Sequence, residues 1–223
     1  GTPKTLDPTG KALTLGAWCI SEKAGGVVMA HGGPFNGYAL VVLRGKPTFM
    51  VRSGKQLATA TAKIKVTNKW IHLAGVLTKD KQMRLYVNGE LAAEAKAPGL
   101  IESVPVQGLQ VGADDGSAVG DYTTPFPFKG VVDEVRVYHR ALNEQEMTKL
   151  ADWGNEPKDK SLVLYSGFEK GKAIDDSGNK HLGKLSGVNI VRAKTGQAIH
   201  FTGKSTPGGG GPGVEHHWTQ DIP

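Results

Sequence analysis

Residues 131–142 read Val-Val-Asp-Glu-Val-Arg-Val-Tyr-His-Arg-Ala-Leu, and this stretch decides the predicted fold. Its β-branched residues favour a strand. Strict alternation predicts one face with Val131, Asp133, Val135, Val137 and His139, and an opposite face with Val132, Glu134, Arg136, Tyr138 and Arg140. Asp133 then lies among valines, where a carboxylate requires either water or a pairing partner.

A short helix is predicted directly after this strand. Asn143 suits the N-cap and Glu146 stands three residues later, a spacing that forms a capping box. Met147, Leu150 and Ala151 follow as an apolar stripe at helical spacing.

The residues on the N-terminal side of the strand predict an antiparallel sheet structure. Short apolar stretches alternate with glycine-rich turns from residue 13 to residue 111, and Asn88-Gly89 is the strongest two-residue hairpin signal. Many strands with a single short helix indicate an all-β protein, either an antiparallel sandwich or a barrel.

Composition and charge narrow the function classes. The net charge of the 223-residue chain is +6, but its basic residues are scattered singly, which favours solvated loops over a nucleic-acid surface. A mild preference for acidic polysaccharides is compatible with this charge. The only cysteine, Cys19, has no partner for an internal disulfide, and no apolar run is long enough for a membrane span.

Catalytic motifs are missing from the sequence. We find no nucleophile elbow, no His-Glu-x-x-His zinc motif and no phosphate-binding loop. Asp133 and Glu134 are adjacent and should point to opposite faces, whereas glycoside hydrolysis needs two carboxylates on one face. We therefore predict that the chain is not an enzyme.

Five segments in series carry a family resemblance. They are Leu13-Thr-Leu-Gly-Ala-Trp18, Trp70-Ile-His-Leu-Ala-Gly-Val76, Met83-Arg-Leu-Tyr-Val-Asn-Gly89, Leu109-Gln-Val-Gly112 and Asp133-Glu-Val-Arg-Val-Tyr-His-Arg-Ala-Leu142. In this order they resemble laminin-G-like, concanavalin A-like lectin/glucanase domains. The resemblance implies an all-β, antiparallel two-sheet jelly-roll sandwich with one short helix. The chain lacks the Glu-x-Asp-x-x-Glu strand that glucanases of this fold carry.

Three further family segments stand at an unexpected end of the chain. Relatives usually begin with segments similar to 162–171, 175–179 and 194–201, which here follow the main body. We favour a circularly permuted domain, in which residues 1–203 form one sandwich with a main body at 13–142 and completing strands at 161–203. The alternative is a second, truncated repeat that begins at Ser161. Residues 204–223 are rich in Gly and Pro and are interpreted as a linker or tail.

The resemblance also implies a structural calcium ion. Carried over by motif, its ligands are Asp133, Glu169 and Asp175, completed by backbone carbonyls at 179–181, since calcium prefers several oxygens. The alternative makes 175–178 a turn and Asp133 a carboxylate that accepts amide hydrogen bonds.

Sugar-binding candidates come from the richest loops, 31–38 and 114–122. Sugars need aromatic faces together with polar donors and acceptors on one surface. We select His31, Asn36, Arg52, Asp115 and Tyr122. The alternative for each of them is ordinary loop chemistry.

These features lead to a functional hypothesis. Residues 31–40 and 112–116 resemble versions of this domain appended to large bacterial extracytoplasmic proteins, which implies a secreted or periplasmic location. We expect a non-catalytic accessory module that binds carbohydrate or docks against neighbouring domains of a larger parent chain, from which the present termini suggest it was excised. One alternative is a polysaccharide lyase or hydrolase of the same fold, which would need a Tyr/His/Arg cluster on the concave face. His72 and Arg84 supply part of such a cluster, but the sequence offers no complete set. Another alternative is a purely structural spacer.

Overall fold

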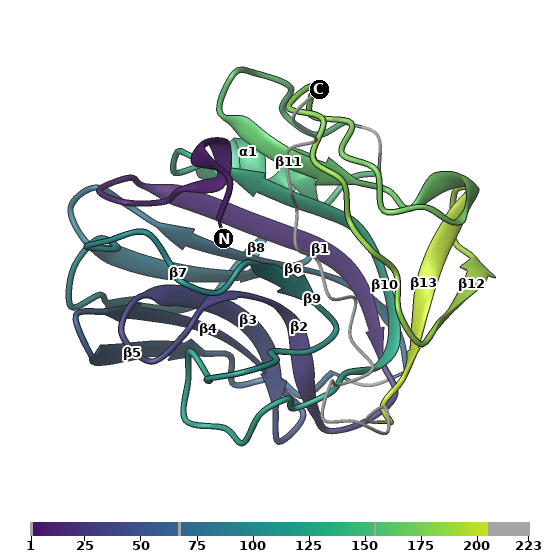
Figure 1. Cartoon of the computed structure of the whole chain (residues 1–223), viewed down its shortest axis with the longest axis horizontal. Coiled ribbons are helices and arrows are strands. Elements are labelled where there is room, and N and C mark those ends of the chain that lie inside the picture. Colours follow the sequence, from purple (N-terminus) through teal and green to yellow (C-terminus); the bar gives the residue numbers. More distant parts are fainter. Residues whose placement is uncertain (1, 67, 154, 205–223) are drawn as a thin grey trace.

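Two antiparallel β-sheets face each other across one apolar core (Figure 1). The computed structural model describes residues 2–66, 68–153 and 155–204. Among these residues there is a single α-helix, α1 (Glu144–Leu150). The predicted jelly-roll sandwich with one short helix is confirmed. No helix of the described part is long and apolar enough to cross a membrane.

The strands divide into a sheet of eight and a sheet of five. The eight-stranded sheet contains, in spatial order, β12 (Val188–Arg192), β13 (Gln197–Thr202), β10 (Lys129–Tyr138), β1 (Leu13–Ser21), β6 (Trp70–Leu77), β7 (Gln82–Val87) and β8 (Glu90–Lys96), with β11 (Leu162–Ser166) also paired to β10. The five-stranded sheet contains β5 (Gln56–Thr61), β4 (Lys46–Ser53), β3 (Gly37–Leu43), β2 (Gly25–Gly32) and β9 (Leu109–Val111). Two short 3₁₀ turns are η1 (Lys4–Leu6) and η2 (Glu169–Gly171).

The central strand β10 contains a bulge that the alternation pattern does not predict. Its register with β1 shifts next to Ala17, and Glu134 has a φ of 56°, in the left-handed region. The extra residue changes which face the following side chains occupy. Val132, Val135 and Val137 therefore all lie in the main core, and the prediction of one uninterrupted alternation is wrong.

Helix α1 forms as predicted. The Asn143 side chain accepts from the backbone N–H of Glu146, and the Glu146 side chain accepts from the N–H of Asn143. Met147 and Leu150 pack in a second apolar cluster with Ala74. Because Leu73 of β6 lies in the main core, α1 covers the opposite face of the eight-stranded sheet.

The C-terminal strands join the same sheet as the main body. β11 pairs with the second half of β10, and β13 pairs with its first half, both on the side away from β1 (Figure 1). Leu164, Ile199 and Phe201 are buried in the main core. The circular permutation itself stays a prediction, and residues 205–223 of the proposed tail lie outside the described residues.

Candidate functional site

A tight loop between β2 and β3 turns an aromatic side chain outward. Gly32 has a φ of 102°, and a Cβ at this position would lie 2.2 Å from the carbonyl oxygen of Asn36, so only glycine fits here. The backbone N–H of Gly33 donates to the same carbonyl at 3.1 Å. Phe35 at the tip of this loop is 55% exposed.

Phe35 lies at a hollow that we call the Phe35 groove. Its volume is about 420 Å³, and its walls are residues 33–36, 103–107 and Ser117. Val104 and Val106 add exposed apolar surface, and Val106 is 91% exposed. The ammonium group of Lys55 lies 5.4 Å from the centre of the Phe35 ring. The groove therefore combines an exposed aromatic ring with apolar and amide-bearing walls.

Asn36 holds three segments of this region together. Its Nδ2 donates to Ser103 Oγ at 2.9 Å, while its Oδ1 accepts from the backbone N–H groups of Gly54 and Glu102 at 3.3 and 3.2 Å. The side chain both lines the groove and joins its walls.

His31 supports the region from inside the protein. Its side chain is buried, and its ring nitrogens lie 3.0 Å from Thr2 Oγ1 and 3.1 Å from the Tyr38 hydroxyl. Burial lowers the pKa of His31 to about 3, so the ring is neutral at physiological pH. His31 is thus a buried histidine with hydrogen-bond partners rather than a residue that a ligand can reach.

Arg52 and Tyr122 stabilise the neighbouring loop, 112–122. Arg52 donates from Nε to the carbonyl of Val119 at 2.6 Å and pairs with Asp121 at 3.6 Å. The Tyr122 hydroxyl donates to Asp114, and burial raises the pKa of that carboxyl to about 6. Both side chains shape the loop without lining the groove.

Asp115 contributes to the groove through its backbone. Its N–H donates to Gln110 Oε1 at 2.7 Å. With its amide oriented to satisfy its neighbours, Gln107 donates to the carbonyls of Gly32 and Asp115 and accepts from the N–H of Ser117. Gln107 therefore ties the β2–β3 loop to the loop that contains Asp115.

All five predicted sugar-binding residues gather at this end of the molecule, but only Asn36 lines the groove. Sequence reasoning missed Phe35 and Gln107. The signal for Phe35 was available, because a phenylalanine among Gly, Pro and Asn in a loop has few ways to become buried.

The three predicted calcium ligands do not come together in one cluster. Asp133 is buried and accepts from the N–H of Glu134 at 2.8 Å. Burial raises its pKa to about 8, and the charges of Glu134 and Glu169 add to the shift. Glu169 is exposed, with its carboxylate against Gly196.

Asp175 instead belongs to a separate hydrogen-bonded turn. Its carboxylate lies 2.6 Å from His181 Nδ1 and accepts from the N–H groups of Tyr165 and Ser177. Burial opposes ionisation, but these hydrogen bonds outweigh it and lower the pKa of Asp175. Within the described ranges, no three His, Cys, Asp or Glu side chains are placed to share a metal ion. Calcium binding by Asp133, Glu169 and Asp175 stays an untested prediction.

The residues of the enzymatic alternative lie on the eight-stranded sheet. His72 is buried, and burial lowers its pKa to about 3. Arg84 pairs with Glu94 at 3.0 Å. Neither side chain lines the Phe35 groove.

Comparison with solved structures finds the same fold at low sequence identity. A heptameric SAP-like pentraxin from Limulus polyphemus is 15% identical, covering 70% of this chain and 77% of that one, with a TM-score of 0.55. A putative carbohydrate binding protein from Bacteroides ovatus is 19% identical, with a TM-score of 0.55, and the match covers 85% of this chain but only 51% of that one.

A third similar structure is domain 4 of a GH43 extracellular arabinanase from Geobacillus stearothermophilus, in complex with arabinotriose. It is 20% identical, covering 67% of this chain and 70% of that one, with a TM-score of 0.53. At such identities these similarities show a shared fold. A comparison with curated protein sequences found no match.

The family assignment comes from a match over residues 2–148, which is more than half of the chain. This range contains all five segments that carried the resemblance in the sequence. Together with the two-sheet sandwich, the match shows that the chain belongs to the concanavalin A-like lectin/glucanases superfamily.

Proposed function

We propose that this chain is a non-catalytic carbohydrate-binding module and that it binds sugar in the Phe35 groove. The observation that carries this proposal is the 55% exposed Phe35 ring beside the amide of Asn36 in a hollow of about 420 Å³. Sugar rings have one apolar face of C–H groups, which packs on an aromatic ring, while their hydroxyls bind amides and hydroxyls.

The walls of the groove supply these partners in a fixed arrangement. Ser103 and Ser117 add hydroxyl groups, and Asn36 and Gln107 join the three wall segments by hydrogen bonds. A groove formed before binding loses little conformational entropy when the ligand arrives.

The non-catalytic part of the proposal follows from the same lining. The wall residues of the Phe35 groove offer amides, hydroxyls and apolar groups, whereas glycoside hydrolysis uses a pair of carboxyl groups beside the scissile bond. Binding is therefore the chemistry that these side chains support.

The chain also has a proposed location and a proposed place within a larger protein. We place it as an accessory module of a larger secreted or periplasmic protein, in contact with carbohydrate and with neighbouring domains. Support comes from the similar fold of one domain of an extracellular arabinanase and from the partial coverage of the Bacteroides ovatus protein.

The Phe35→Ala variant tests the binding site. We expect wild-type protein to bind at least one oligosaccharide on a glycan array, without release of reducing ends, and Phe35→Ala to bind it about tenfold more weakly. Ile64→Ala is the matched control, because Ile64 is an exposed apolar residue outside the groove. Equal binding by wild type and Phe35→Ala would contradict the assigned site.

A further inference from the structure

A second groove lies beside β11, the strand that pairs with the second half of β10. Two neighbouring hollows of about 840 and 270 Å³ share Lys158 and Tyr165 as lining residues. The larger one is bounded by residues 158–160 on one side and 176–179 on the other. We call the two together the Tyr165 groove, and we propose that it binds a segment of a neutral oligosaccharide chain independently of the Phe35 groove.

The Tyr165 ring is held in place by two contacts. Its hydroxyl donates to Glu134 Oε1 at 3.0 Å, and the guanidinium carbon of Arg136 lies 4.1 Å from the ring centre. Arg136 is 2% exposed and is itself bound to Glu134 and, at 3.3 Å, to Glu156. An aromatic ring fixed in this way provides a stacking surface at little entropic cost.

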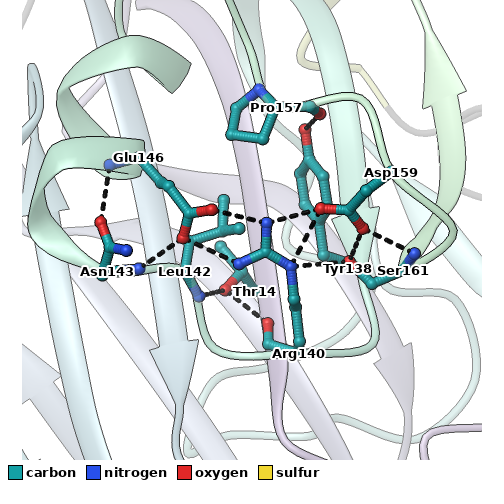
Figure 2. Close-up of polar contacts among 9 residues, drawn as sticks. All are labelled: Thr14, Tyr138, Arg140, Leu142, Asn143, Glu146, Pro157, Asp159 and Ser161. Carbon is teal, nitrogen blue, oxygen red and sulfur yellow. Dashed lines mark hydrogen bonds and ion pairs between the residues drawn. The ribbon is translucent and has the colours of Figure 1, made fainter.

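The first wall is anchored by a fork of ion pairs, shown in Figure 2. The guanidinium group of Arg140 donates to Glu146 at 2.7 and 2.8 Å and to Asp159 at 2.6 Å. Asp159 also accepts from the N–H of Ser161, and the Tyr138 hydroxyl donates to the carbonyl of Pro157 at 2.8 Å. Residues 157–161 are thus attached both to the end of β10 and to the start of α1.

The second wall is fixed by the turn around Asp175. The N–H of Asp176 donates to the carbonyl of Tyr165 at 2.8 Å, and Asn179 Nδ2 donates to the carbonyl of Val163 at 3.2 Å. Asp175 accepts from the N–H of Ser177 at 2.8 Å. The first wall is also joined to β11, because the N–H of Leu162 donates to the carbonyl of Asp159 at 3.0 Å. Both walls are therefore connected to the strand that carries Tyr165, and the groove exists before a ligand binds.

The polar groups along the groove suit hydroxyls. Lys158 and Lys160 line one wall, and Asp176, Ser177 and Asn179 line the other. Within residues 2–66, 68–153 and 155–204, the side chains of Lys160 and Asp176 make no hydrogen bond or ion pair, although the backbone N–H of Asp176 donates to Tyr165. The larger hollow is lined by two lysines and two aspartates, so its charges balance. In the smaller hollow, Glu134 and Glu156 are paired with Arg136. This balance favours a neutral ligand rich in hydroxyls over a charged polymer. The volume of the larger hollow, about 840 Å³, suits a segment of a chain more than a single sugar.

Calorimetric titration of the Phe35→Ala variant tests this groove without a contribution from the first one. The probes are cellohexaose, xylohexaose and arabinohexaose, with hexagalacturonate as the acidic comparison. We expect Phe35→Ala to retain binding of at least one neutral probe. Adding Tyr165→Ala should weaken that binding about tenfold, while adding Tyr165→Phe should preserve it because the ring remains.

A second variant adds Lys160→Ala and Asp176→Ala together to Phe35→Ala. It leaves the Arg136 and Arg140 contacts intact, so its thermal melting midpoint should match that of Phe35→Ala. The added substitutions should also weaken binding of the neutral probe. The Tyr165 groove is refuted if Phe35→Ala binds no probe, if only hexagalacturonate binds, or if both sets of groove variants bind as tightly as Phe35→Ala. Loss of all binding in Phe35→Ala, with normal binding by wild type, would leave the Phe35 groove supported alone.

Discussion

At the scale of single residues, the polar side chains near the Phe35 groove act mainly on other parts of the protein. Asn36 uses both ends of its amide to join loops, and Arg52 donates to a loop carbonyl. A residue that satisfies backbone groups in this way determines the form of a binding surface without contacting the ligand. Residue type alone does not separate these two roles.

Replacing Asn36 tests its role as a connector. We expect Asn36→Ala to lower the free energy of unfolding by about 1–2 kcal/mol, because the N–H groups of Gly54 and Glu102 lose their acceptor. Urea unfolding measures this change. Asn189→Ala, at an exposed position of the edge strand β12, should change stability by less than about 0.5 kcal/mol. Equal effects of the two substitutions would contradict the connecting role.

The pH dependence of stability tests Asp133. Its pKa is raised from 3.8 to about 8 in the folded protein, so the folded state binds more protons than the unfolded state between these values. The stability that this proton provides is complete below pH 4 and is lost as pH rises through 8. Asp133→Asn, which keeps an acceptor for the N–H of Glu134, should flatten this decline. At pH 9 it should be more stable than wild type by roughly 1–3 kcal/mol.

Chemical unfolding of both proteins between pH 4 and pH 9 measures this difference. The comparison cancels other titrating groups, including Asp114, whose pKa is raised to about 6. Parallel curves for wild type and Asp133→Asn would show that Asp133 titrates normally.

At the scale of elements, two features come from contacts that are distant in the sequence. The bulge of β10 lies where the strand changes its partner from β13 to β11. The turn around Asp175 reaches η1, because His181 Nε2 lies 2.6 Å from Thr5 Oγ1 while its Nδ1 lies 2.6 Å from Asp175. This buried network connects the N-terminal segment to the C-terminal third of the chain.

Removing the centre of that network should destabilise the protein. We expect His181→Ala to cost about 2–4 kcal/mol, since it leaves the buried Asp175 without its main partner and creates a cavity. Thr5→Val, which removes only the hydroxyl group, should cost about 1 kcal/mol. Urea unfolding of both single variants and the double variant gives their coupling energy. Additive effects would show that Thr5 and His181 do not act together.

At the scale of the whole molecule, β11, β12 and β13 complete the eight-stranded sheet. Without them, the outer edge of β10 would be unpaired, and the core would lose Leu164, Ile199 and Phe201. Phe201 also packs against Gly112, where a Cβ would lie 2.1 Å from its ring. The body formed by residues 13–142 thus depends on strands that follow it in the chain.

A chain that ends at Lys160 tests this dependence. We expect it to lack a cooperative thermal transition and to expose apolar surface, because the main core loses large side chains that include Leu164, Phe168, Ile199 and Phe201. Calorimetry and dye binding measure these properties, with the full chain as control. A sharp melt of the shortened chain would favour the interpretation of residues from Ser161 onward as a second, truncated repeat.

The features that the sequence by itself determined are local. The all-β class, the capping box at Asn143 and the hairpin at Asn88-Gly89, where both residues have positive φ, follow from neighbours in the chain. Turn and cap preferences depend on a few consecutive residues, and the alternation of strands depends on their immediate surroundings. The family resemblance added the sandwich, because its five segments keep a fixed order.

Only the tertiary structure decided which groups meet. The bulge at Glu134 reassigns the faces of β10, and Asp175 pairs with His181 rather than joining Asp133. The exposure of Phe35 and the rigid placement of Tyr165 likewise depend on segments far apart in the chain. Such contacts form where the combined free energy of burial, hydrogen bonding and packing is lowest for the whole molecule. A short stretch of sequence does not determine that sum, because it depends on residues far apart in the chain.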